Sequence, residues 1–149
     1  MRNNTQITDE EFSALLNMDK YFEEKEVMMP GNGERVHFKL HSAEKRENFY
    51  LDVNRSGIIE LKKFTLQNRF LVVPLVRLDI DSAPHINPDG SKTSRNHIHI
   101  YKEGYGDSWA FDLGSSGSFH FAKCSSFREY FIEFCKYCNI QLSQIQLLI

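Results

Sequence analysis

Five side chains that can ligate a metal ion lie close together in the sequence. They are two aspartates and three histidines: Asp79, Asp81, His85, His97 and His99. Successive side chains of a β-strand point to opposite faces, so His97 and His99 share one face of a predicted strand. By the same alternation, Asp79 and Asp81 share a face near the end of an earlier predicted strand. Pairing of these two strands would bring His85, both strand histidines and one or both aspartates together.

This donor set predicts a divalent metal ion. Three imidazole nitrogens and a carboxylate oxygen suit Zn²⁺, which takes four such ligands in tetrahedral geometry. Mn²⁺, Fe²⁺ and Ni²⁺ accept the same donors, so the type of metal is less closely defined than the site. The competing interpretation is a half-exposed strand whose histidines face solvent. A lone His-x-His pair would favour that interpretation, whereas His85 and the Asp-x-Asp pair favour a metal.

Two other groups could do chemistry, and each has a simpler explanation. Cys135 and Cys138 have the Cys-x-x-Cys spacing of a zinc site, which His120 and Cys124 could complete. Cys138 nevertheless falls on the apolar face of a predicted helix, which favours core thiols. A polar stripe on one predicted strand could bind phosphate, although such stripes more often face solvent; it comprises Lys63, Thr65, Gln67 and Arg69.

Hydrophobic periodicity predicts one helix before and one helix after a run of strands. Thr8 to Glu11 matches a capping box, and apolar residues at helical spacing extend the first helix from about Asp9 to Phe22. A serine at position 125 or 126 can cap the second helix. Its apolar face carries Phe127, Phe131, Phe134 and Cys138.

Alternating apolar and polar residues predict the strands. They lie around residues 36–40, 49–53, 63–66, 71–81, 97–101, 108–113, 119–122 and 140–149. Pro74 removes one donor from its ladder, so its strand should lie at an edge or contain a bulge. A polar loop over residues 82–96 joins the two strands of the candidate site, and residues 114–117 look like a flexible connection. We therefore predict an α+β fold, with an antiparallel sheet of about five to seven strands and one N-terminal and one C-terminal helix, in a single domain over residues 1–149.

The composition predicts a globular protein of the cytoplasm. Hydrophobic residues make up 41% of the chain and charged residues 26%. No stretch approaches the roughly 20 apolar residues that cross a bilayer, so no membrane partner is expected. The first residues also lack the apolar core of a signal peptide. Three cysteines, an odd number in such a chain, favour reduced thiols.

The charge is small but unevenly distributed. A formal net charge of −2 does not by itself indicate a nucleic-acid-binding protein or a DNA mimic. Between Thr8 and Glu26, however, seven acidic residues face two basic ones. A solvated helix face is the ordinary explanation. The alternative is a surface that binds a partner protein, with Glu10, Glu11, Glu23 and Glu24 as its candidate residues.

Two resemblances involve the histidine cluster. The pattern His97-x-His99-x₃-Glu103 resembles part of the first metal motif of the cupin family. The second cupin motif has no counterpart, so this resemblance implies the local chemistry without the fold. The runs from Leu75 to Gly90 and from His97 to Leu113 are similar to a poorly characterised family in phages and prophages of low-GC Gram-positive bacteria. The residues that carry this second resemblance are His85, Asn87, Pro88, Asp89, Gly90, His97, His99 and Gly104 to Asp107.

The second resemblance covers roughly residues 60 to 115 and implies a mobile genetic element, whose small accessory proteins are often anti-CRISPR inhibitors or toxins. The first functional hypothesis is accordingly a small phage-encoded inhibitor with a structural zinc ion. It would bind a host defence protein, such as a Cas9-type nuclease, as type II anti-CRISPR proteins do. The absence of a convincing nucleophile or general base beside the ligands supports it.

The second hypothesis is a metal-dependent nuclease or ribonuclease toxin. Three ligands would then leave a position for water, with Asp81 or Glu103 as the base. Phosphate would be held by Lys63, Arg69 or Arg77. The number of protein ligands separates the two hypotheses, because structural zinc sites are closed and catalytic ones keep a water.

Overall fold

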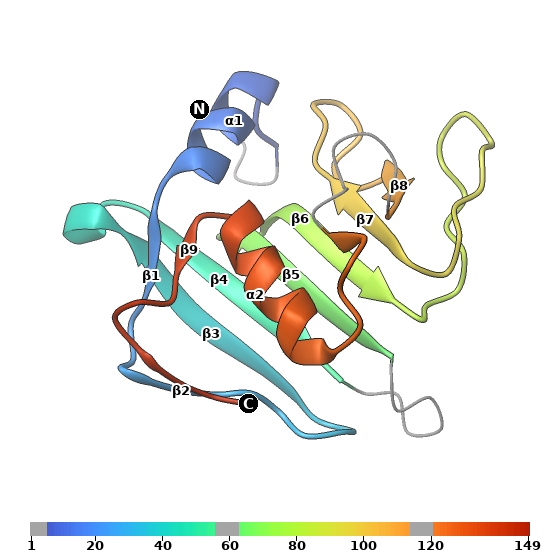
Figure 1. Cartoon of the computed structure of the whole chain (residues 1–149). Coiled ribbons are helices and arrows are strands. Elements are labelled where there is room, and N and C mark those ends of the chain that lie inside the picture. Colours follow the sequence, from blue (N-terminus) through green and yellow to red (C-terminus); the bar gives the residue numbers. More distant parts are fainter. Residues whose placement is uncertain (1–5, 56–62, 114–120) are drawn as a thin grey trace.

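A mixed β-sheet dominates the computed structural model, which describes residues 6–55, 63–113 and 121–149 (Figure 1). Within these residues the sheet comprises β1 (Lys20–Phe22), β3 (Arg35–Ser42), β4 (Asn48–Asn54), β5 (Phe64–Phe70), β6 (Val73–Ile80), β7 (His97–Ile100), β8 (Ala110–Asp112) and β9 (Ile140–Gln141). Its strand order is β8-β7-β6-β5-β4-β3-β1-β9. Neighbouring strands pair antiparallel, except that β1 and β9 are parallel. A separate parallel pair joins β2 (Glu26–Met28) to β10 (Gln146–Leu148).

Two α-helices accompany the sheets in the described part of the chain. The first, α1 (Asp9–Asn17), begins with the predicted capping box, in which the Thr8 hydroxyl accepts from the Glu11 amide. The second, α2 (Phe127–Tyr137), is capped by Ser126. A short 3₁₀ helix spans Ala43–Lys45. No helix among the described residues is long and apolar enough to span a membrane.

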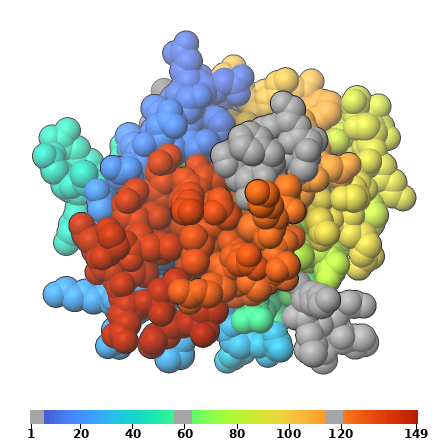
Figure 2. All heavy atoms as spheres, in the orientation of Figure 1, coloured from blue at the N-terminus to red at the C-terminus, as the bar shows by residue number. Residues whose placement is uncertain are grey.

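The apolar core lies between the large sheet and α2, which crosses one face of the sheet (Figure 1). The C-terminal part of the chain covers this face in the space-filling view (Figure 2). Every second side chain of β4 and β5 is buried, as their burial patterns show. Phe49, Leu51 and Leu66 join Phe131 and Phe134 in the core, and none of the five is measurably exposed.

The alternate residues of these strands form a hydrogen-bonded polar layer on the opposite face. Asp52 on β4 is the centre of one group, since its Oδ2 accepts from Arg69 Nε at 2.6 Å and from Gln67 Nε2 at 3.1 Å. The Arg69 guanidinium lies 4.1 Å from the centre of the Tyr50 ring. Asp79 on β6 is the centre of the second group. The sheet thus separates an apolar layer from a polar one.

The prediction of an α+β fold, with an antiparallel sheet of about five to seven strands and one N-terminal and one C-terminal helix, is wrong, because the structure is mostly sheet. The sheet is larger and mixed, a second small sheet is present, and α2 is followed by two further strands. The strands that sequence reasoning missed or merged are two or three residues long, which is too short to show a period of two. Two of their pairings are parallel and join distant parts of the chain, so local patterns carry no sign of them.

The predictions for individual helices and strands agree better with the structure. The first helix ends at Asn17 and not at Phe22, because the chain becomes extended at Met18 and then enters β1. Pro74 lies beside the predicted irregularity, a register shift in the pairing of β5 with β6. The connection predicted at 114–117 and the first residues of the strand predicted at 119–122 lie outside the described residues.

Candidate metal centre

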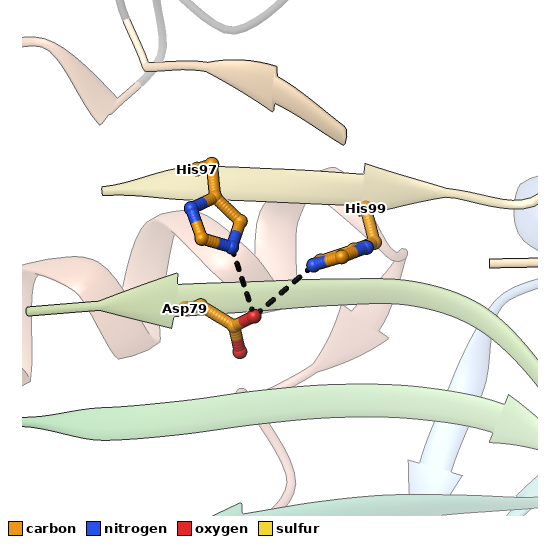
Figure 3. Close-up of side chains that lie close together, drawn as sticks. All are labelled: Asp79, His97 and His99. Carbon is orange, nitrogen blue, oxygen red and sulfur yellow. Dashed lines mark hydrogen bonds and ion pairs between the residues drawn. The ribbon is translucent and has the colours of Figure 1, made fainter. Parts of the chain in front are cut away.

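Three of the predicted ligands meet on neighbouring strands of the polar face. The antiparallel register places His97 on β7 directly opposite Asp79 on β6, and His99 opposite Arg77. Because side chains alternate, all four residues lie on one side of the sheet. Figure 3 shows both imidazole rings directed at the carboxylate of Asp79. The predicted pairing of these two strands is therefore confirmed.

The ligand atoms converge tightly. The Nε2 atoms of His97 and His99 each lie 3.1 Å from the same oxygen, Asp79 Oδ2. One ligand atom from each of the three residues lies within 4.8 Å of the other two. The three residues are only 7%, 2% and 1% exposed, in chain order. A buried group of two imidazoles and a carboxylate could hold a metal ion.

Backbone carbonyl groups determine which ring nitrogens carry protons. His97 Nδ1 lies 2.9 Å from the carbonyl oxygen of Ser94, and His99 Nδ1 lies 2.8 Å from that of Asp107. A carbonyl oxygen only accepts, so Nδ1 donates in both rings. In the neutral rings both Nε2 lone pairs then face a carboxylate oxygen. That arrangement needs either an added proton or a cation, and backbone-oriented histidines of this kind are typical of metal sites.

The carboxylate of Asp79 has two further partners. Thr65 Oγ1 donates to its Oδ1 at 3.0 Å, and Arg77 Nε lies 3.3 Å from its Oδ2. Burial raises the pKa of Asp79, but the hydrogen bonds that His97 and His99 donate when their Nε2 atoms carry protons, together with the charge of Arg77, outweigh this effect. Together they hold the pKa well below its usual range. Asp79 is therefore an anion, as a metal ligand must be.

The contact with Asp79 changes the pKa of His97 in the opposite direction. Burial lowers the pKa of the imidazole, whereas the hydrogen bond to Asp79, followed by that to the carbonyl of Ser94, raises it. The net result is a raised pKa. A proton on Nε2 of His97 is therefore the direct competitor of a metal ion for this position.

Arg77 also lies against the ligand group. Its Nη2 is 2.9 Å from His99 Nε2, and its Nη1 donates to Asp107 Oδ2 at 3.1 Å. An arginine only donates, so in this contact the His99 Nε2 lone pair accepts. The guanidinium and a metal ion would thus use the same lone pair.

Two other predicted ligands do not join this group. His85 lies near it, with ring centroids 4.6 Å from His99 and 6.2 Å from His97, but its Nε2 lies 2.6 Å from the carbonyl oxygen of Ser108. Asp81 follows the end of β6 in a left-handed conformation with φ of 55°, and this breaks the alternation with Asp79. It lines a pocket with Phe127 and Tyr130 of α2.

The remaining candidates have other partners. Glu103, the possible base, accepts from the amide of Asp9 at 2.9 Å, and its own amide donates to Asp9 Oδ1 at 2.8 Å. This holds Glu103 at the start of α1. Cys135 and Cys138 are fully buried core residues, as predicted. Among the described residues no cluster of metal ligands includes them, and His120 lies outside those residues.

The four acidic residues of the candidate partner surface lie on two separate elements. Glu10 and Glu11 belong to α1, whereas Glu23 and Glu24 follow β1. Glu10, Glu23 and Glu24 are exposed. The carboxylate of Glu11 instead accepts from the amide of Thr8 and completes the capping box.

Sequence reasoning did not place Thr65, Thr93 and Asp107 at the centre. Thr93 Oγ1 lies 3.1 Å from His97 Nδ1 and adds a second contact on that nitrogen. Arg77 was considered only as a phosphate contact. Its i, i+2 spacing from Asp79 was a signal that could have placed it on the same face.

Comparison with known proteins adds one match. A family model described as "Family of unknown function (DUF6978)" matches residues 7–140. No curated protein and no solved structure matches the chain.

Proposed function

The chain belongs to the family of unknown function DUF6978, and on the geometry of its buried centre we propose that it is a metal-binding protein. Asp79, His97 and His99 would hold one divalent transition-metal ion. Zinc is the first candidate, because two imidazole nitrogens and a carboxylate are a common part of its ligand set. Mn²⁺, Fe²⁺ and Ni²⁺ are also compatible with these donors.

One observation carries the proposal. The carbonyl groups of Ser94 and Asp107 keep the protons of both rings on Nδ1, so both Nε2 lone pairs face one anionic oxygen of Asp79. Arg77 already lies against Asp79 Oδ2 and His99 Nε2, and a metal ion between the three acceptors would further offset the cost of burying them together. The surrounding hydrogen bonds hold the rings in the orientation that a metal requires.

Elemental analysis of the protein, purified without chelator, tests the proposal. We expect about one transition-metal ion per chain, and loss of that ion in the double variant His97→Ala, His99→Ala. The control variant is His37→Ala, His41→Ala, which removes two histidines of β3 and should leave the metal in place. A metal content below one ion per ten chains after dialysis against zinc would refute metal binding. It would favour a proton on His97 as the partner of Asp79.

The inhibitor hypothesis is a second proposal for what the metal-binding domain does. Exposed carboxylates at Glu10, Glu23 and Glu24 support it, since they offer negative charge to a basic partner. We propose a stable complex with a host defence protein, a Cas9-type nuclease being the first to test. Reversing these three charges should weaken the complex and reduce its salt dependence, because exposed charges act through screened attraction. Glu11 is left unchanged, because its reversal would remove a helix cap.

The alternative proposal, a metal-dependent nuclease or ribonuclease, is favoured by the number of ligands. The described residues supply three donors, and catalytic zinc sites typically have three protein ligands and one water. Incubation of the metal-loaded protein with RNA and DNA separates the two proposals. Cleavage that disappears in His97→Ala would establish the enzyme, whereas a stable complex without cleavage would establish the inhibitor.

A further inference from the structure

We propose that the metal centre and Arg77 together bind a tetrahedral oxyanion, namely a phosphate or phosphoryl group. This inference rests on the metal binding proposed above and adds the ligand class of the same site. It applies to both the inhibitor and the nuclease proposal, since it concerns the ligand that the centre binds and not a reaction of that ligand.

A polar pocket lies beside Asp79, whereas His97 and His99 do not line it. It has a volume of about 370 Å³, and Asp79 belongs both to its wall and to the ligand group. Lys63, Thr65 and Arg77 also line it. Thr65 pairs with Asp79 in the sheet, so its hydroxyl and the Arg77 guanidinium lie on either side of the carboxylate. A ligand in this pocket would meet two cationic side chains, the Thr65 hydroxyl group and the carboxylate of Asp79 to which that hydroxyl donates.

The contacts of Arg77 mean that metal binding changes its partners. Its Nη2 lies 2.9 Å from the His99 Nε2 lone pair that the metal would need. Once a metal takes that lone pair, Nη2 loses its acceptor. The metal, Arg77 and Lys63 then carry more positive charge than the carboxylates of Asp79 and Asp107 balance. An anion in the pocket is the group that would restore both the hydrogen bond and the charge.

A tetrahedral oxyanion matches this requirement. One of its oxygens can take the coordination position that three protein donors leave on a tetrahedral metal. A second oxygen can accept from the Arg77 guanidinium, whose planar arrangement of donors suits phosphate. Lys63 is exposed and lines the pocket, so its ammonium group can approach the outer oxygens. Each group that the metal leaves unpaired thus acquires a partner.

The two ligands should therefore bind with positive coupling. The metal releases Arg77 for the anion, and the anion offsets the repulsion between Arg77 and the metal. Linkage requires that each ligand raise the affinity for the other by the same factor.

The test uses Co²⁺, which is paramagnetic, together with inorganic phosphate observed by ³¹P NMR. Saturable broadening of the phosphate line by the Co²⁺-loaded protein is expected, beyond the broadening caused by the same concentration of free Co²⁺. In Arg77→Gln the affinity for phosphate should fall roughly tenfold to a hundredfold, as for the loss of a charge-assisted hydrogen bond. The variant should bind Co²⁺ at least as tightly as the unmodified protein. Dimethyl phosphate in place of phosphate distinguishes a diester, as in nucleic acid, from a terminal or free phosphate.

Arg46→Gln is the matched control, because Arg46 is an exposed arginine that pairs with Glu44 and belongs neither to the pocket nor to the ligand group. It should leave the broadening unchanged. Arg77→Lys keeps the charge and should show intermediate affinity, which guards against a folding defect in Arg77→Gln. Failure of the unmodified protein to bind Co²⁺ would contradict the proposed function itself. Binding of Co²⁺ without broadening, or equal broadening in Arg77→Gln, would overturn only the oxyanion site.

Discussion

Metal removal should lower the melting temperature of this protein without unfolding it at room temperature. A ligand that binds only the folded chain stabilises it by RT ln(1 + [L]/Kd), or about 2.7 kcal/mol at a hundredfold excess over Kd. In a chain of 149 residues, 1 kcal/mol changes the melting temperature by roughly 3 °C. We therefore expect a difference of about 8 °C between metal-saturated and chelator-treated protein. Each further tenfold rise in free metal should add about 4 °C.

The structure explains why metal removal should lower the stability of the chain only in part. The ion would join only β6 to β7 on the polar face, whereas the apolar core lies on the other face of the sheet. Scanning calorimetry over a series of buffered zinc concentrations measures the effect, with Mg²⁺ as the unsuitable metal. Asp79→Asn preserves the shape of the side chain but removes the anion, and it should abolish the dependence on zinc. An unchanged melting temperature after verified metal removal would refute a stabilising metal. A full zinc-dependent shift in Asp79→Asn would refute Asp79 as a ligand of that metal.

Three further substitutions test other parts of the structure. Burial lowers the pKa of Lys20 to about 8 from its ordinary value of 10.5, so between these values the unfolded chain holds more protons than the folded one. The free energy of unfolding should accordingly rise with pH across this window, by up to about 3 kcal/mol, relative to Lys20→Met measured by urea denaturation. Asn87→Ala should cost about 2 kcal/mol in the same assay, because the Asn87 amide bonds both the N–H and the carbonyl of Ala110 in β8; a loss below about 0.5 kcal/mol would contradict this. Leu71→Asn should stabilise the chain by about 1 kcal/mol in thermal unfolding, because Leu71 has a φ of 52° that asparagine tolerates better; a lower melting temperature would show that the Leu71 side chain matters more than its backbone.

The strand alternation on which the site prediction depended is a local property, and for that reason it placed His97 and His99 on one face of β7 correctly. His97 and His99 needed only a period of two to share a face, and the register with β6 then brought Asp79 opposite them. Asp81 does not share the face of Asp79 for an equally local reason, since the strand ends at Ile80 and Asp81 itself has a left-handed backbone conformation. The sequence at Asp81 contains no glycine that would have signalled this turn.

The larger fold could not be derived in the same way. β1 is three residues long and continues the apolar spacing of α1, so the helical pattern concealed it. β9 is only two residues long and becomes a strand through its pairing with β1. The orientation of the histidine rings was also beyond reach, because it depends on the carbonyl groups of Ser94 and Asp107, and a carbonyl group is common to every residue.

The two parallel pairings also have a consequence for the order in which the chain can fold during synthesis. Strands β3 to β6 are consecutive antiparallel neighbours, so each can pair soon after it is made. β1 can likewise pair early with β3, but its other edge waits for β9, and β2 waits for β10. One acceptor of the Lys20 ammonium group, a carbonyl oxygen, also lies 118 residues later in the chain. Contacts of such high sequence separation form slowly. One edge of β1 and the strand β2 therefore lack their partners until the residues of β9 and β10 have been made.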